Sequence, residues 1–175
     1  MNMNQFTQKS LAAIQGAQDI ALEHGNQQIE QPHLLLALVG DREGFIPQLL
    51  TAMEMTVPSF EAAVKAEVEK LPKVSGSGRE ADKVYVSQDV DRALKASEQE
   101  ARAMKDEYIS VEHILLGLLA HPNGALKELL RTYRLDKEKV LRALAQVRGS
   151  QRVTSDNPEE TYNALKKYGS DLVER

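Results

Sequence analysis

The sequence predicts an all-α protein made of two tandem four-helix repeats related by a pseudo-twofold axis. The chain aligns with itself at an offset of 80 residues, with residues 29–38 on residues 109–118, and needs no gap on either side. Apolar residues recur at helical spacing, and almost no stretch alternates as a strand does. A gap-free duplication of short helices is typical of a duplicated bundle, and the seam between its halves is a place where a ligand can bind.

The alignment extends over most of both halves. A single insertion would destroy the common offset, so the matches support one another. The aligned pairs include Gln8 with Gln88, Ala13 with Ala93, Ala21 with Ala101, Gly44 with Gly124, Leu50 with Leu130, and Ala63 with Ala143.

The first helix of each half is predicted at residues 7–24 and 87–105. The apolar side chains of residues 11–22 fall on one stripe at helical spacing. Thr7 and Ser87 stand at the two N-termini, where a hydroxyl can accept a bond from a free backbone N–H. The same type of cap therefore recurs at the same offset.

The remaining helices also come in pairs with matching start signals, such as a cap residue, a glycine or an early proline. The predicted pairs are a helix from Pro32 and one after Ser110, helices 45–53 and 125–133 introduced by Gly44 and Gly124, and helices after Thr56 to about residue 70 and after Asp136 to about residue 147. The only strand candidate is the short segment 83–86.

Two segments of different composition divide the chain. Residues 71–79 are rich in glycine and serine and predict a connector between the repeats. Residues 148–157 are polar and aperiodic and predict a linker, after which an acidic turn predicts a helix at 161–168. We therefore expect a domain at 1–148, with repeats at about 5–70 and about 85–148, a linker at 149–158, and the start of a truncated further domain at 159–175.

Composition excludes several classes of function. A net charge of −4 and a pI near 5.6 argue against a nucleic-acid-binding surface. The chain has no cysteine, so thiol catalysis and disulfides are excluded and a reducing compartment is favoured. The N-terminus lacks the features of an export signal, and the longest apolar runs are too short to span a membrane. We expect a soluble, cytoplasmic protein.

No motif predicts catalysis. Gly76 and Gly78 neither follow a convincing strand nor lead into Gly-Lys-Ser/Thr, so they do not predict a phosphate site. His33 and His113 lack metal-ligand partners at helical spacing, and we expect each to bond a nearby backbone group at a helix start. Acidic and basic residues alternate along 89–107, which predicts a solvated face. We expect no catalytic residue, no metal and no cofactor in this chain.

The two first helices differ in charge. The first carries Gln5, Gln8, Gln15 and Gln18 but few charges, whereas its counterpart is densely charged. A surface with few charges can contact another protein at a low desolvation cost. Neutral drift explains the same difference, and both interpretations stay open.

Residues 112–119, Glu-His-Ile-Leu-Leu-Gly-Leu-Leu, together with the paired repeat, resemble the N-terminal domain of the Clp (Hsp100) unfoldases. Residues 71–78 and 148–162 resemble the disaggregase branch of that family more than its protease-linked branch. Residues 164–172 are similar to the segment that leads into the first ATPase domain. The resemblance covers essentially the whole chain and implies the Clp N-domain fold.

The resemblance implies a module that engages substrate for an ATP-dependent disaggregase. Such a module binds exposed apolar segments of unfolded or aggregated polypeptides weakly and passes them to a hexameric AAA+ ring. The implied partners are those polypeptides, the rest of its own chain in a homohexamer, and the DnaK chaperone system. ATP and Mg would belong only to the missing ATPase domains, so this chain is not expected to be an enzyme.

The resemblance also implies site residues. Thr7, Asp106 and Glu112 match polar positions that family members use in chaperone action. Where some relatives carry leucines of an apolar substrate groove, this chain has a different set of three residues. They are Ala96, Glu100 and His113. We therefore expect a shallower and more polar cleft there. Docking of a folded adaptor, as in the protease-linked branch, and a structural bundle with no ligand are the alternatives.

Overall fold

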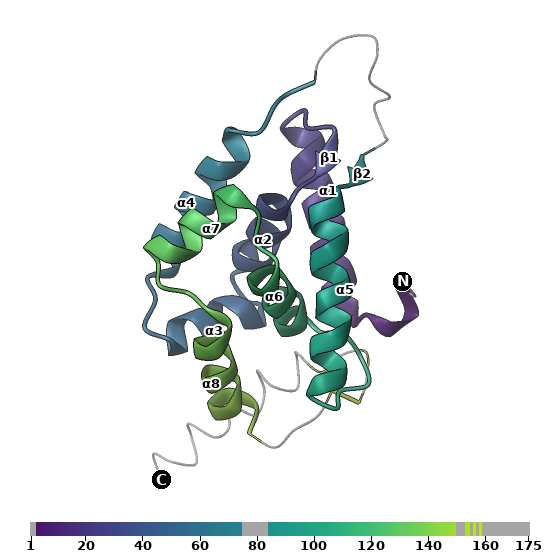
Figure 1. Cartoon of the computed structure of the whole chain (residues 1–175), viewed down its shortest axis with the longest axis vertical. Helices are drawn as coiled ribbons and strands as arrows, with labels where there is room; N and C mark the ends of the chain where they lie inside the picture. Colours follow the sequence, from purple (N-terminus) through teal and green to yellow (C-terminus); the bar gives the residue numbers. More distant parts are fainter. Residues whose placement is uncertain (1–2, 75–83, 150–152, 155, 157, 159–175) are drawn as a thin grey trace.

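The computed structural model describes residues 3–74, 84–149, 153, 154, 156 and 158, and confirms the all-α fold (Figure 1). The expected helix at 161–168 lies outside the described residues. In chain order the elements are η1 (Met3–Gln5), α1 (Gln8–Glu23), β1 (Gln28–Ile29), α2 (Gln31–Gly40), α3 (Phe45–Ala52), α4 (Val57–Glu69), β2 (Tyr85–Val86), α5 (Gln88–Ala103), α6 (Val111–Ala120), α7 (Gly124–Thr132) and α8 (Lys137–Arg148).

Most predicted helix starts are confirmed. The Thr7 hydroxyl accepts a bond from the backbone N–H of Ser10 (3.1 Å), and Ser87 accepts the equivalent bond from Val90 (3.1 Å). Asp136 also caps its helix through its side chain. Thr56 precedes α4 but makes no side-chain cap bond, so proline in the first turn is the remaining start signal there.

Two short parallel pairings join the repeats and display the pseudo-twofold axis. Ile29 of β1 pairs with Val86 of β2, and the equivalent residues Ile109 and Phe6 pair in the same way. The backbone N–H of Ser87 donates to Ile29 (3.1 Å), as that of Thr7 donates to Ile109 (3.0 Å). In the strand candidate 83–86, whose first residue lies outside the described part of the chain, Tyr85–Val86 is a strand; β1 was not predicted because two residues show no periodicity.

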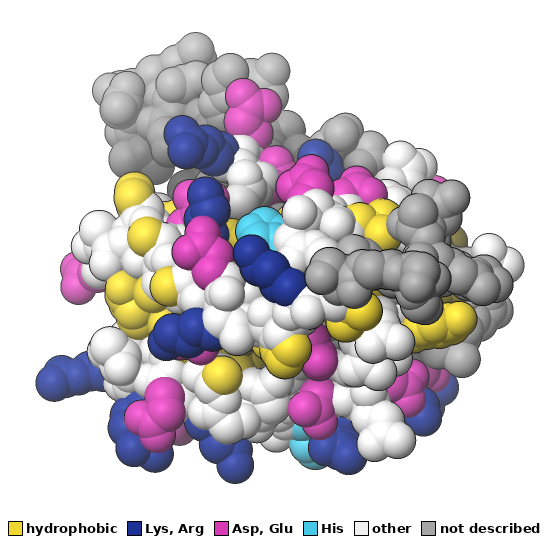
Figure 2. Space-filling model, turned by 90° about the horizontal axis from the view of Figure 1, so that it is seen from above, with side chains coloured by type: hydrophobic (Ala, Val, Ile, Leu, Met, Phe, Trp, Pro, Cys, Tyr) yellow, Lys and Arg dark blue, Asp and Glu magenta, His cyan; other side chains and the backbone are white. Residues whose placement is uncertain are grey.

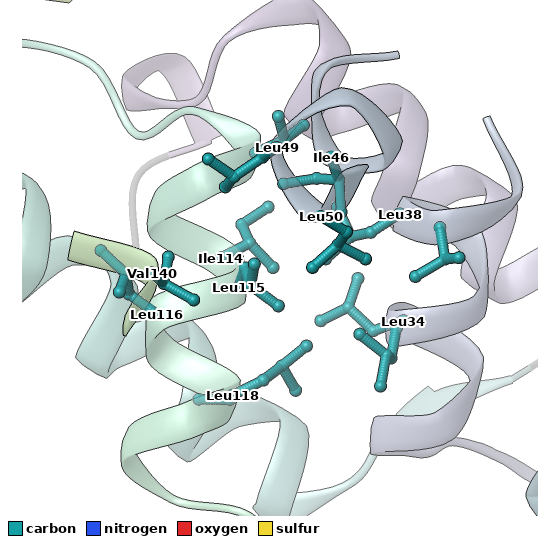
Figure 3. Close-up of a cluster of buried hydrophobic side chains, with 14 of the residues drawn as sticks. Leu34, Leu38, Ile46, Leu49, Leu50, Ile114, Leu115, Leu116, Leu118 and Val140 are labelled. Atoms are coloured by element: carbon teal, nitrogen blue, oxygen red, sulfur yellow. The ribbon is translucent and has the colours of Figure 1, made fainter. Parts of the chain in front are cut away.

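The centre of the molecule is an apolar core built around α2 and α6. Both helices are apolar on nearly every side, as expected for helices enclosed by others. Figure 3 shows side chains of α2, α3 and α6 pointing toward one another across the seam between the repeats. The fully buried residues shown there include Leu34, Ile46, Leu49, Leu50, Ile114, Leu115 and Leu116. The middle of the seam is therefore filled and offers no binding cleft.

The two repeats differ in how closely their first two helices approach. A Cβ added at Gly117 of α6 would lie 2.2 Å from the carbonyl oxygen of Ala93 and 2.3 Å from Oγ of Ser97 in α5. The equivalent residue of α2 is Ala37, whose methyl group is accommodated. A Cβ added at Gly16 of α1 would meet that methyl carbon at 3.5 Å, an ordinary contact. Consequently α5 and α6 close on each other, whereas α1 and α2 leave more space.

Replacing Gly117 with alanine should therefore destabilise the domain. The added methyl group would push α5 and α6 apart, and overpacking of this kind costs about 1–3 kcal/mol. Urea unfolding followed by circular dichroism would measure the loss. The matched control is Gly16→Ala, which has room for the methyl group and gains helix propensity of up to about 1 kcal/mol. Equal midpoints for the two variants would contradict this account of the packing.

Candidate functional site

A hollow with a mostly apolar lining lies on the first repeat, between α1, α2 and α4. It is a groove with a cavity volume of about 570 Å³. Its floor consists of small and aliphatic side chains contributed by α1 and α2. They include Ala12, Ala13, Gly16, Ile20, Leu36 and Ala37. An open apolar concavity of this size suits a few side chains of a partner polypeptide.

The groove is open because its walls are lined by small side chains. Ala13 and Gly16 face α2 where a larger residue would fill the space, and Ala37 holds the helices apart. The rim carries both signs of charge, including Lys9 and Asp41, whose Nζ and Oδ2 atoms are 3.8 Å apart. Both side chains are largely exposed, so this pair adds little stability. The groove therefore selects for apolar surface more than for charge.

Acidic and basic side chains are also mixed elsewhere on the surface. Figure 2 shows them interleaved on one face, with the hydrophobic side chains in small patches between them. No group of three or more metal-ligating side chains occurs in the part of the chain that the structure describes. Among the described residues no helix is both long and apolar enough to cross a membrane.

Ala96 and Glu100, which were predicted to line a substrate groove, lie elsewhere. Ala96 is buried between helices, and the carboxylate of Glu100 forms an ion pair with Lys137. Their equivalents in the first repeat are Gly16 and Ile20, and these two do line the groove. This face of the repeat unit is thus open in the first copy and closed in the second, because Gly117 lets α5 and α6 approach each other closely. The predicted role of Ala96 and Glu100 in substrate binding stays a prediction.

Thr7 is fully buried and joins the repeats. Besides capping α1, its hydroxyl donates to Oγ of Ser10 (3.0 Å), which in turn donates to the carbonyl oxygen of Ile109 (2.9 Å). These bonds hold the start of α1 against the loop before α6. Thr7 offers no surface to a partner in this arrangement.

Asp106 is the centre of a buried polar network in the second repeat. The guanidinium of Arg148 donates two bonds to its carboxylate (2.7 and 3.0 Å) and a third to Glu112 (3.3 Å). Nδ1 of His113 accepts from the backbone N–H of Ser110 (2.9 Å), so Nε2 carries the proton and donates to Oδ2 of Asp106 (2.7 Å). All these charged groups are shielded from solvent.

The charge of Asp106 is stabilised despite its burial. Burial by itself raises the pKa of this carboxyl group, but hydrogen bonds from His113, Arg148 and the Val153 N–H, with the nearby Arg148 charge, lower the pKa to about 2. The side chains of Asp106, Glu112 and His113 therefore bond within this buried network and do not line a cleft. The predicted role of Asp106 and Glu112 in chaperone action, and that of His113 in the substrate groove, stay predictions.

The first repeat contains a neutral version of this network. Nδ1 of His33 accepts from the backbone N–H of Glu30 (2.8 Å), and Nε2 donates to Oδ1 of Asn26 (2.8 Å). The expected backbone bond is confirmed for both histidines. In the second repeat Asp106 replaces Asn26, and Arg148 stands where the first has Val68. The sequence reading missed Arg148, although the paired changes from neutral to charged residues were a signal for it.

Known proteins with a similar sequence are Clp chaperones. Residues 5–133 match the family model described as Clp repeat (R) N-terminal domain. The chain is 45% identical over 175 residues to the chaperone protein ClpB of Nitratidesulfovibrio vulgaris, and 39% identical over 173 residues to that of Bacillus cereus. In both cases 99% of this chain is covered but only 20% of the relative. The chain thus spans about a fifth of the length of these relatives.

Solved structures share the fold at low sequence identity. The Hsp104 N-terminal domain from Candida albicans has a TM-score of 0.76 and 22% identity, covering 89% of this chain and 99% of that one. A complex of the ClpV N-domain with a VipB peptide has a TM-score of 0.65 and 14% identity, covering 89% and 91%.

The buried His33 should make stability depend on pH. Burial, and then repulsion from His24, lowers the pKa of His33 from 6.5 to about 4. The unfolded chain therefore binds a proton before the folded one, and stability present above pH 6.5 is lost as the pH falls toward 4. The loss attributable to this group is on the order of 3 kcal/mol. Urea unfolding at several pH values would measure it.

The pH dependence of the free energy of unfolding is compared between two variants, His33→Gln and His121→Gln. The first variant removes the buried titrating ring and should flatten the pH dependence between 6.5 and 4. The second removes an exposed ring and should leave the dependence as it is. A His33→Gln variant that loses as much stability as the parent over this range would show that another group is responsible.

Proposed function

This chain belongs to the Clp repeat N-terminal domain family, and on that basis we propose that it is the substrate-engaging module of an ATP-dependent protein disaggregase. It binds exposed apolar segments of unfolded or aggregated polypeptides weakly and passes them to a hexameric AAA+ ring in the cytoplasm. The whole protein acts as a homohexamer together with the DnaK chaperone system, and ATP and Mg bind to its ATPase domains. The ClpB relatives favour this function over adaptor docking.

The observation that supports the proposal best is the groove between α1, α2 and α4. Its apolar floor is accessible, whereas most large aliphatic side chains of the described chain are buried in the core. The charged residues around the groove are of both signs, so they would not restrict binding to segments of one charge. A domain of the same fold holds a peptide in the ClpV–VipB complex, which agrees with such a use of the fold.

Binding in a groove of this size is expected to be weak. An apolar contact of a few hundred Å² provides on the order of several kcal/mol, from which the cost of ordering the bound chain is subtracted. Weak binding lets a segment be released to the ring. Several copies of the domain in one assembly would compensate for the weak affinity, because they raise the effective concentration of binding sites around a single aggregate.

A charge in the floor of the groove should weaken this binding. In Ala13→Glu a carboxylate would have to be desolvated beside the bound apolar segment, so affinity for a casein-like unfolded protein should fall at least roughly tenfold, or about 1.4 kcal/mol. Fluorescence anisotropy of labelled casein would measure the change. The parent chain is expected to bind with a Kd on the order of micromolar or weaker.

The matched control is Ala62→Glu, the same replacement at an exposed residue of α4 that does not line the groove. It should bind as the parent does, and thermal unfolding would verify that both variants fold. If Ala13→Glu bound casein as well as Ala62→Glu, the groove would not be the binding site. No binding by the parent chain at millimolar casein would exclude the proposed function itself.

A further inference from the structure

The chain beyond α8 returns to the domain and contacts both repeats. Val153 is fully buried and belongs to the hydrophobic core, although it lies within the segment predicted as a linker. Asp156, three residues later, is exposed but bonds to the start of α1. These two residues are two anchors at different places on the domain.

The first anchor joins Val153 to the second repeat. Its backbone N–H donates to Oδ1 of Asp106 (2.9 Å), and its carbonyl oxygen accepts from the backbone N–H of Glu107 (2.7 Å). The same carboxylate oxygen accepts from Arg148 (2.7 Å). Asp106 therefore links the last turn of α8 to the returning chain, and Arg148 holds its carboxylate in the orientation that Val153 requires.

The second anchor joins Asp156 to the first repeat. Its carbonyl oxygen accepts from the backbone N–H of Gln8 (2.8 Å), and its Oδ2 accepts from Nε2 of Gln8 (3.2 Å). Gln8 begins α1, where the first N–H groups lack partners within the helix and a negative charge is favourable. The returning chain thus completes the N-terminus of the helix that forms one wall of the groove.

The anchors are small compared with the core. One buried valine and a few hydrogen bonds hold them, whereas the centre is sealed by α2 and α6 from both repeats. Asp106 would keep its bonds from His113 and Arg148 if Val153 left. The returning chain can therefore detach while the eight helices stay packed.

We propose that Val153 and Asp156 form a releasable strap, for which Asp106, Glu107 and Gln8 are the docking site. With the strap docked, the chain leaves the domain beside the start of α1, and the orientation of the domain to whatever follows is restricted. Release moves the last point of attachment from Asp156 back to Gly149, and the seven residues of separation can span roughly 20 Å. The link between reach and client capture rests on the proposed function; the docking itself does not.

Amide hydrogen exchange of this chain, read residue by residue by NMR, tests the strap without any client. The amides of Glu107 and Gln8 are the reporters because they donate to Val153 and Asp156. Val153→Ser should release the strap and raise their exchange rates at least tenfold, with the amides of α6 unchanged. Val84→Ser, the same replacement at a partly buried residue ahead of β2, is the control and should leave the reporters slow.

Asp106→Asn tests whether Asp106 positions the strap. Both carboxylate oxygens of Asp106 accept hydrogen bonds, so in either orientation the NH2 group of an asparagine would face a donor instead of accepting from it. Asn26 in the first repeat shows that asparagine can still accept from the histidine. The Glu107 reporter should exchange faster in this variant too. Fast exchange of both reporters in the parent chain, or unchanged rates in Val153→Ser, would show that there is no strap. A rise shared by α6 in Val153→Ser would show that the segment is an inseparable part of the core.

Discussion

The packing of α2 against α6 fixes the position of everything else in this domain. Both helices are apolar on almost every side, so each must be enclosed by its own repeat and by the other one. Their contact fills the seam along the pseudo-twofold axis with aliphatic side chains (Figure 3). As a consequence, the apolar groove lies not on this axis, where a duplicated fold would allow a symmetric cleft, but on the outer face of the first repeat.

On those outer faces the two copies have diverged. The exchange of small residues between α1–α2 and α5–α6 places Gly16 opposite Ala37 in one repeat and Gly117 against Ala93 and Ser97 in the other. The position of a single methyl group decides whether the helices close or leave a groove, because backbone atoms cannot yield as a flexible side chain can. The first repeat thereby has an open groove, and the corresponding face of the second repeat is closed.

The closed repeat also contains the ionic network. Burying Asp106, Glu112 and Arg148 is costly, and such groups are tolerated only when their hydrogen bonds are largely satisfied. The neutral pair Asn26 and His33 shows that the fold does not need these charges to hold a helix start. What the charges add is a connection between α8, the start of α6 and Val153, and this is the connection on which the strap depends.

The sequence by itself determined the eight helices, the caps at Thr7 and Ser87 and the backbone bonds of the two histidines. These features are local, because the partners lie within four residues and the repeat supplies each signal twice. It placed a substrate groove at Ala96 and Glu100, whose equivalents Gly16 and Ile20 line the groove of the first repeat, and the role of the predicted pair stays a prediction. Which copy opens, the pairing of Ile29 with Val86, and the burial of Arg148 and Val153 were decided only by the tertiary structure. Each of these features depends on contacts between segments far apart in the chain. At such a contact the presence of one methyl group or one charge matters more than the helix or strand preference of the residues themselves.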